Sequence, residues 1–179
     1  MIRILAMLLA ALAFVAPISP ASAQSDPQNT LVLETTKGPV VIRLRNDIAP
    51  AHAERLKQLA RDGFYNNVPF HRVIAGFMAQ TGDGERGDGR GKSKYPNIKA
   101  EFSQVPFRRG IVGMARASDP NSANCQFFIT YADAPHLNGQ YTVVGEVVSG
   151  MDNVDKIKKG EPVQDPDRIT RAFVQADKK

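Results

Sequence analysis

The chain has 179 residues, of which 42% are hydrophobic and 23% charged, a composition typical of a globular domain rather than a disordered chain. Its formal net charge of +5 comes from Lys and Arg residues spread along the sequence, without the clustered basic stripe that nucleic-acid binding requires. The single cysteine, Cys125, excludes an internal disulfide, so the core has to supply the stability.

Residues 1–23 are predicted to form a cleaved signal peptide. Arg3 gives a positive start, residues 4–16 are apolar, and Ala21–Ala23 form a small-residue cleavage site. The apolar run is short, which disfavours the alternative of an uncleaved membrane anchor. The leader has one basic and no acidic residue, so its removal lowers the net charge from +5 to +4. We therefore expect an exported protein of a Gram-negative periplasm, without a membrane anchor after cleavage; secretion beyond the periplasm is the alternative.

After a polar, flexible lead-in at residues 24–29, the alternation of apolar and polar residues predicts eight strands. The helix predicted at residues 47–62 has Pro50 in its first turn, an apolar stripe through Leu56 and Leu59, and Gly63 as its stop. A shorter helix is predicted at residues 151–158, and a Gly-rich loop at residues 82–93. The predicted strands are residues 31–36, 40–45, 70–74, 77–81, 111–115, 126–130, 142–148 and 168–176.

Eight strands and two helices in one domain, residues 30–179, suggest a mostly β fold. The arrangement that we expect is a closed eight-stranded antiparallel β-barrel capped by two α-helices. The chain contains no internal repeat.

Two segments, residues 70–83 and 126–130, interleave aromatic residues with Arg72, Gln80 and Gln126. A guanidinium among aromatic side chains is costly to desolvate, so its presence in a strand needs a reason. One reason is a structural ion pair or an Arg whose head reaches solvent. The other is an apolar groove with a few fixed donors and acceptors, as in sites for small or extended ligands.

Other chemistries find little support in the sequence. Residues 82–87 match the dinucleotide pattern G-x-G-x-x-G, but the following residues cannot readily begin the helix which that site needs. His52, His71 and His136 have no metal-ligand spacing, so we predict no metal and no cofactor. No nucleophile context is present either, and Cys125 is interpreted as a small packed residue.

The words Phe-His-Arg at residues 70–72, Gly-Phe-Met-x-Gln-x-Gly-Asp at 76–83 and Gln-Phe-Phe-Ile at 126–129 resemble the signature of the cyclophilin-type peptidyl-prolyl cis/trans isomerases. The resemblance extends from about residue 30 to residue 176. It implies a helix-capped barrel and catalysis of X–Pro isomerisation. It also implies that the partners are proline-containing peptides and unfolded or partly folded exported proteins, bound by a monomer.

The resemblance assigns roles to residues at matching positions. Arg72 matches the catalytic arginine, and Gln80 the residue that orients it and binds substrate. The proline pocket is matched by Phe77, Met78, Phe128 and Leu137. The rim that holds the residues before proline is matched by Ala115, Arg116 and Gln126, and Tyr141 is a further rim position. His71 is a weaker member of the same surface.

The sequence departs from the pattern of many eukaryotic members at the rim. His136 stands where they have a Trp, Tyr141 where they have a histidine, and Arg116 where they have an Asn. These changes leave the arginine and the proline pocket intact, and they predict weak cyclosporin binding. A proline-peptide-binding chaperone or scaffold module with incidental turnover is the alternative function; the retention of both Arg72 and Gln80 favours the enzyme.

Overall fold

The computed structural model describes residues 26–178, so the predicted signal peptide lies outside the described residues. Within them, one antiparallel sheet is accompanied by two α-helices, α1 (Pro50–Arg61) and α2 (Met151–Asp155), and by short 3₁₀ turns at Pro27–Asn29, Pro135–Leu137 and Gln175–Asp177. The strands are β1 (Thr30–Thr35), β2 (Gly38–Leu44), β3 (Val68–Pro69), β4 (Arg72–Ile74), β5 (Met78–Thr81), β6 (Ile111–Met114), β7 (Phe127–Thr130), β8 (Val143–Ser149) and β9 (Arg168–Val174).

The mostly β fold is confirmed, but the closed eight-stranded barrel is corrected to an open sheet of nine strands in the order β3-β9-β1-β2-β8-β6-β7-β5-β4. The two edge strands, β3 and β4, are separated in the chain only by Phe70 and His71. One strand was predicted there, at residues 70–74. The chain instead leaves its pairing with β9 after Pro69 and begins pairing with β5 at Arg72. The sheet therefore curls until its two edge strands, β3 and β4, lie close together. They are joined by the short chain segment between them and not by hydrogen-bonded pairing.

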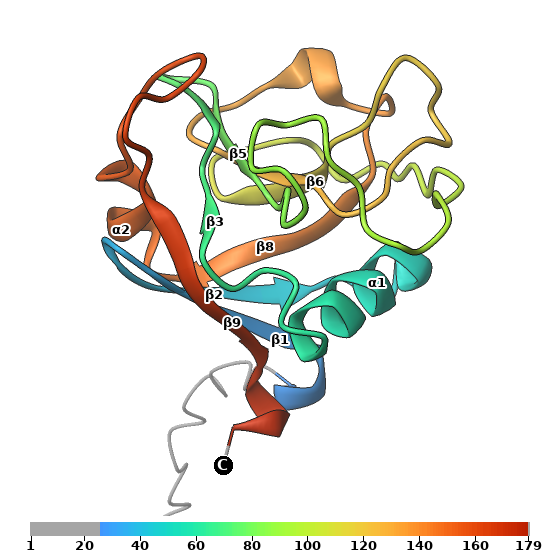
Figure 1. Ribbon diagram of the computed structural model, residues 1–179. Helices are drawn as coiled ribbons and strands as arrows, with labels where there is room; N and C mark the ends of the chain where they lie inside the picture. The colour runs from blue at the N-terminus through green and yellow to red at the C-terminus, as the bar shows by residue number, and fades with distance from the viewer. Residues whose placement is uncertain (1–25, 179) are drawn as a thin grey trace, which may run out of the picture.

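Helix α1 packs on one side of the curled sheet and α2 lies on the opposite side (Figure 1). In α1 the predicted stripe is buried, with Leu56 and Leu59 at most 1% exposed, and Gly63 follows the helix with a φ of 70°. A left-handed φ suits glycine, which explains why the helix stops there. At the other end, the Glu101 carboxylate accepts the backbone N–H groups of Ala51 and His52 at 3.2 and 3.1 Å.

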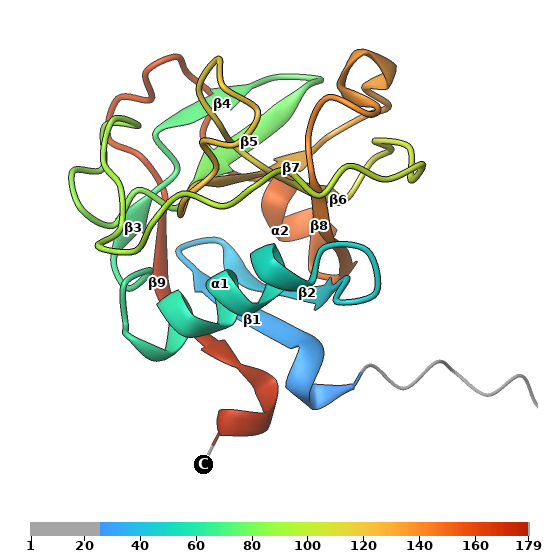
Figure 2. The ribbon, with the colours of Figure 1, turned by 90° about the vertical axis from the view of Figure 1, so that its right-hand side faces the viewer.

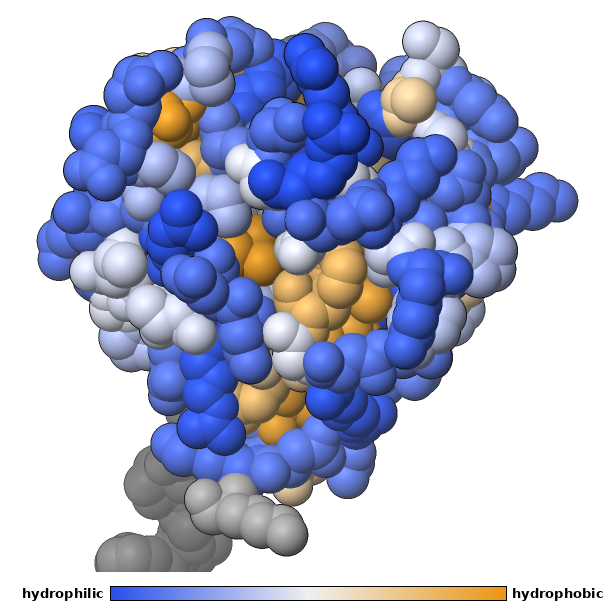
Figure 3. Space-filling model, viewed as in Figure 1, coloured by the Kyte–Doolittle hydropathy of each residue, from blue (hydrophilic) through white to orange (hydrophobic). Residues whose placement is uncertain are grey.

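Side chains of the sheet face two separate apolar clusters. On β7, Phe127 and Ile129 point into the interior of the curled sheet, whereas Phe128 points outward into a smaller cluster with Met78 and Leu137. This alternation follows from the two-residue period of a strand. The surface in Figure 3 is mostly hydrophilic, and most of the apolar residues that show lie in hollows between polar parts of the surface. No helix within residues 26–178 is long and apolar enough to cross a membrane.

Candidate active site

A row of facing residues crosses four strands on the outer side of the sheet. Arg72 of β4 pairs with Gln80 of β5, Gln80 with Phe128 of β7, and Phe128 with Gly113 of β6. A Cβ on Gly113 would lie 2.4 Å from Cζ of Phe128, so only glycine leaves room for that ring. The sheet register thus places a guanidinium, an amide and an aromatic ring side by side (Figure 2 shows the four strands).

Beside this row lies a pocket of about 280 Å³ that has an apolar base and a polar rim. Met78, Phe128 and Leu137 are nearly fully buried at its base. The Phe128 ring stacks on Phe107 at 5.8 Å and meets Tyr141 edge-on at 5.8 Å, measured between ring centroids. The pocket is lined by Arg72, Phe77, Met78, Gln80, Ala115, Arg116, Phe128, His136, Leu137 and Tyr141. The geometry suits a small apolar ring held close to a charged donor.

A chain of polar contacts connects the guanidinium to the neighbouring loop. Nη1 of Arg72 lies 3.4 Å from Oε1 of Gln80, and Nε2 of Gln80 donates to Oε1 of Gln126 at 3.0 Å. Nε2 of Gln126 in turn donates to the backbone carbonyls of Gly89 and Gly91, both at 3.0 Å. Because each amide has a partner on both sides, its orientation is set by the contacts around it.

The loop of residues 82–93 is organised by Asp83, which is 1% exposed. Its carboxylate accepts the backbone N–H groups of Glu85, Arg86, Gly89 and Gly91 at 2.9 to 3.2 Å. Burial alone would raise the pKa of Asp83, but the backbone donors outweigh it and hold the pKa below its usual value. One carboxylate thus fixes the two glycines whose carbonyls hold Gln126.

A second pocket, of about 240 Å³, adjoins the first and shares Gln80, Ala115 and Arg116 with it. Arg116 lines both pockets. Its guanidinium lies 4.5 Å from the centre of the Tyr141 ring and donates to the backbone carbonyl of Gln140 at 2.9 Å. The two pockets therefore lie next to each other, with Gln80, Ala115 and Arg116 lining both.

The structure brings the predicted site residues together with one exception. The His71 side chain is buried beneath Gly89 and lines neither pocket. His136, expected at the rim, lines the pocket with its ring centroid 5.3 Å from that of Phe77. One residue that contacts the site was not predicted: Glu161 contacts the guanidinium of Arg72. Glu161 is 89 positions from Arg72 in the chain, and no local pattern signals that they meet.

The site offers little for covalent or metal chemistry. Within residues 26–178, no group of three or more His, Cys, Asp or Glu side chains could hold a metal ion. Burial raises the pKa of the Cys125 thiol to about 12, so it is not ionised at neutral pH. The site provides an arginine, two amides and a pocket with an apolar base. These groups suit an enzyme that changes the conformation of its substrate and leaves covalent bonds intact.

These features agree with a comparison to known families. Residues 30–174 match the model of the family described as cyclophilin type peptidyl-prolyl cis-trans isomerase. The chain belongs to this family, and it is a peptidyl-prolyl cis-trans isomerase of the cyclophilin type.

Relatives and solved structures support the assignment. The chain is 54% identical to a probable peptidyl-prolyl cis-trans isomerase of Brucella suis over 190 residues, which cover 96% of each chain. It is 39% identical to a peptidyl-prolyl cis-trans isomerase of Helicobacter pylori over 136 residues, which cover 74% of this chain and 82% of the other. A cyclophilin from Hirschia baltica superposes with a TM-score of 0.80 at 29% identity, over 86% of this chain and 76% of that one. A cyclophilin type isomerase from Cryptosporidium parvum, solved in the presence of the dipeptide Ala-Pro, gives a TM-score of 0.75 at 30% identity, over 81% and 98%.

Proposed function

We propose that Arg72 is the catalytic residue and that the pocket around Phe128 holds the substrate proline. Rotation about a peptide bond faces a barrier of roughly 18–20 kcal/mol because resonance must be broken. For X–Pro bonds the two planar isomers are close in energy, yet their uncatalysed exchange takes about tens to hundreds of seconds. An enzyme therefore needs only to bind the twisted amide more tightly than either planar form.

The guanidinium of Arg72 can supply that preference. When the amide twists, the proline nitrogen becomes pyramidal and gains a lone pair that a donor can bind. A fixed N–H donor at the edge of an apolar pocket acts on this lone pair with little competition from water. The observation that carries the proposal is that Arg72 lines the same pocket as the buried Met78, Phe128 and Leu137. The Ala-Pro dipeptide present with the Cryptosporidium relative supports a proline-containing ligand.

The adjoining pocket is the proposed seat of the residues before proline. Ala115, Arg116 and Gln126 line it, and the first two also line the proline pocket, so a peptide extended across them would pass from one pocket into the other.

An NMR exchange measurement on a short Ala-Pro-Phe-type peptide tests the proposal without a coupled protease. We expect the protein at micromolar concentration to accelerate exchange between the cis and trans forms of the peptide, seen as broadening of their resonances. Arg72→Ala should abolish most of that acceleration. A protein that bound the peptide without accelerating its exchange would instead be a proline-peptide-binding scaffold.

We further propose that the enzyme works in the periplasm on exported proteins. The support is the leader at residues 1–23, with its Ala21–Ala23 cleavage site. The test is to fractionate cells of the source bacterium and determine the N-terminus of the protein. A periplasmic protein that begins at Gln24 is expected, and a cytoplasmic protein with an intact leader would refute the proposal.

A further inference from the structure

The segment between α2 and β9, residues 156–167, runs along the free edge of β4. Gly160 and Val73 exchange backbone hydrogen bonds, both of 2.8 Å, and the N–H of Val163 donates to the carbonyl of His71 at 3.1 Å. Two views show this orange-red segment beside the green β4–β5 hairpin (Figures 1 and 2). These bonds hold the backbone on both sides of Glu161 against the strand that carries Arg72.

The side chain of Glu161 makes the closest contact of the arginine. Its Oε1 lies 2.5 Å from Nε of Arg72, whereas Oε1 of Gln80 lies 3.4 Å from Nη1. The contact to Gln80 is long for a hydrogen bond, so by itself it restrains the guanidinium weakly. Glu161 lies outside both pockets, because it lines neither of them.

We infer that Glu161 is a positioning residue for Arg72; this rests on the catalytic role proposed for that arginine. An arginine side chain is long and rich in rotamers, and here it is 39% exposed. Glu161 holds the Nε edge of its planar fork while Gln80 holds one Nη nitrogen. Two contacts at different points fix the plane and leave the remaining N–H donors facing the pocket.

Geometry, and not charge, is the part of this contact that matters for catalysis. Both side chains are partly exposed, 39% for Arg72 and 55% for Glu161, and water and salt screen such pairs strongly. The carboxylate therefore takes little from the field of the guanidinium in the pocket. Misplacing a catalytic donor by about 1 Å, in contrast, can cost up to about a hundredfold in rate.

The inference predicts different results for two substitutions of the same residue. Glu161→Ala removes the acceptor, and we expect kcat in the NMR exchange assay to fall about threefold to tenfold while KM changes less than about twofold. Glu161→Gln keeps an oxygen that accepts the Nε–H, and it should retain at least about half of the parental kcat. The ¹⁵Nε–¹Hε resonance of Arg72 should move in Glu161→Ala and stay near its parental position in Glu161→Gln.

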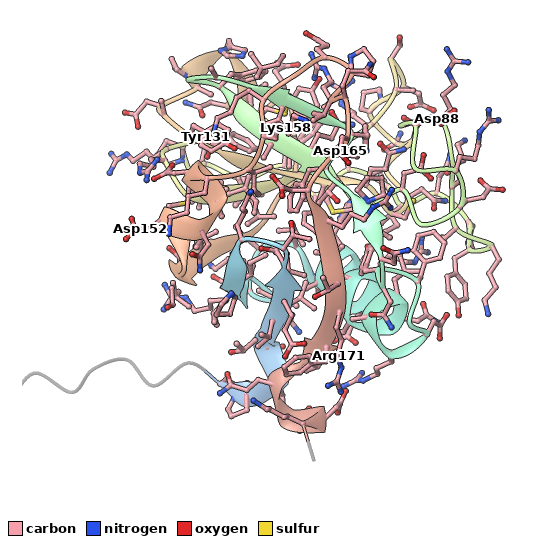
Figure 4. The ribbon with its side chains drawn as sticks, turned by 60° about the vertical axis from the view of Figure 1, so that its left-hand side comes forward. Asp88, Tyr131, Asp152, Lys158, Asp165 and Arg171 are labelled. Carbon is pink, nitrogen blue, oxygen red and sulfur yellow. The ribbon has the colours of Figure 1, made fainter. Side chains whose placement is uncertain are left out.

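Asp165→Asn is the matched control, because it removes the same charge from the same segment. Asp165 is exposed, and within residues 26–178 its carboxylate pairs only with Lys158, at 4.0 Å (Figure 4 labels both residues). Its left-handed φ of 50° is one that asparagine tolerates. We expect parental kcat and an unmoved Arg72 resonance.

Three results would overturn the inference. They are an unchanged or increased kcat in Glu161→Ala, an equal loss in Glu161→Ala and Glu161→Gln, and a loss confined to KM. Each of these results requires that the parent protein is active. If the proposed function were wrong, the parent itself would be inactive, so the two failures can be told apart.

Discussion

Among single residues, Arg72 has the largest expected effect on catalysis. Arg72→Ala should lower kcat/KM by about a hundredfold, because a missing charged donor in such a site costs on the order of 3 kcal/mol. The fold should survive, since the side chain is partly exposed at the edge strand. Arg72→Lys should also be poor, because an ammonium cannot contact both Glu161 and Gln80 with one planar group. Parental turnover in folded Arg72→Ala would refute the mechanism.

Phe128 links binding to stability. It is 5% exposed, lines the proposed proline pocket and fills the space above Gly113. We expect Phe128→Ala to weaken the binding of proline peptides and to lower the free energy of unfolding by roughly 3 kcal/mol, since burial and cavity contributions add. Phe102→Ala is the control, because Phe102 is 44% exposed and should change neither quantity. Tight peptide binding by Phe128→Ala would exclude Phe128 from the pocket.

His136 concerns ligands larger than the substrate. Its ring lies on Phe77 at the pocket rim, with 5.3 Å between the ring centroids. An indole at this position would offer a larger apolar face and an N–H donor, so His136→Trp should raise the affinity for cyclosporin and barely change turnover. Titration of the parent and of His136→Trp with cyclosporin measures the two affinities. Tight binding by the parent would contradict the expected weak binding.

At the scale of elements, the sequence predicted the kinds of structure better than their boundaries. All eight predicted strands and both helices exist, although α2 ends at Asp155 and not at residue 158. The strand predicted at residues 70–74 failed at Phe70 and His71, because apolar alternation cannot reveal that a chain changes its pairing partner. That Arg72, Gln80 and Phe128 lie together could be predicted because a strand period and a family motif coincide there. Glu161 was missed because its contact depends on the path of a distant segment.

The loop of residues 82–93 acts on the site through Asp83. Asp83→Asn replaces one of two accepting oxygens by an amide that cannot accept, so the N–H groups of Gly89 and Gly91, or those of Glu85 and Arg86, lose their partner. We expect faster hydrogen exchange at the amides of these residues and a severalfold lower kcat/KM, because Gln126 loses its fixed carbonyls. The interior of the sheet does not depend on this carboxylate, so the protein should remain folded.

The control for this variant is Asp88→Asn, an exposed carboxylate of the same loop, which should leave both quantities near parental values. The lowered pKa of Asp83 also sets a direction with pH. Because the folded state holds the charged form more tightly, the order that Asp83 gives the loop is complete above about pH 4 and is lost as the pH falls through its folded pKa. Parental exchange rates in Asp83→Asn would contradict this role.

At the scale of the whole molecule, the folding core and the proposed active site lie on opposite faces of the same strands. The interior cluster includes Leu33, Ile42, Phe127 and Ile129, whereas the proposed substrate pocket belongs to the outer cluster around Phe128. Substitutions of the partly exposed Arg72 and Gln80 should therefore cost activity more than stability, whereas substitutions of the buried Met78, Phe128 and Leu137 should cost both. The two buried histidines, His52 and His71, line neither pocket, so we expect them to affect stability and not substrate binding.

Both histidines make the stability of the fold depend on pH. Burial lowers the pKa of His52 although the Glu101 carboxylate, 2.6 Å from Nδ1, opposes the shift and Arg55 adds to it. Burial likewise lowers the pKa of His71 in spite of nearby acids. In the unfolded chain both imidazoles have a pKa of about 6.5, so below that pH the unfolded state binds protons that the folded state does not bind. The free energy of unfolding should therefore fall as the pH is lowered from 7.5 through the folded pKa values.

Urea unfolding at pH 7.5 and pH 5.5 measures this dependence. His52→Gln keeps a hydrogen-bonding partner for Glu101 but cannot titrate, so the difference in unfolding free energy between the two pH values should be smaller than in the parent, whatever the substitution costs at either pH. His136→Gln is the control, because His136 is exposed and its loss should leave the parental difference. If His52→Gln and the parent lose the same stability between pH 7.5 and pH 5.5, His52 does not carry the acid sensitivity of the fold.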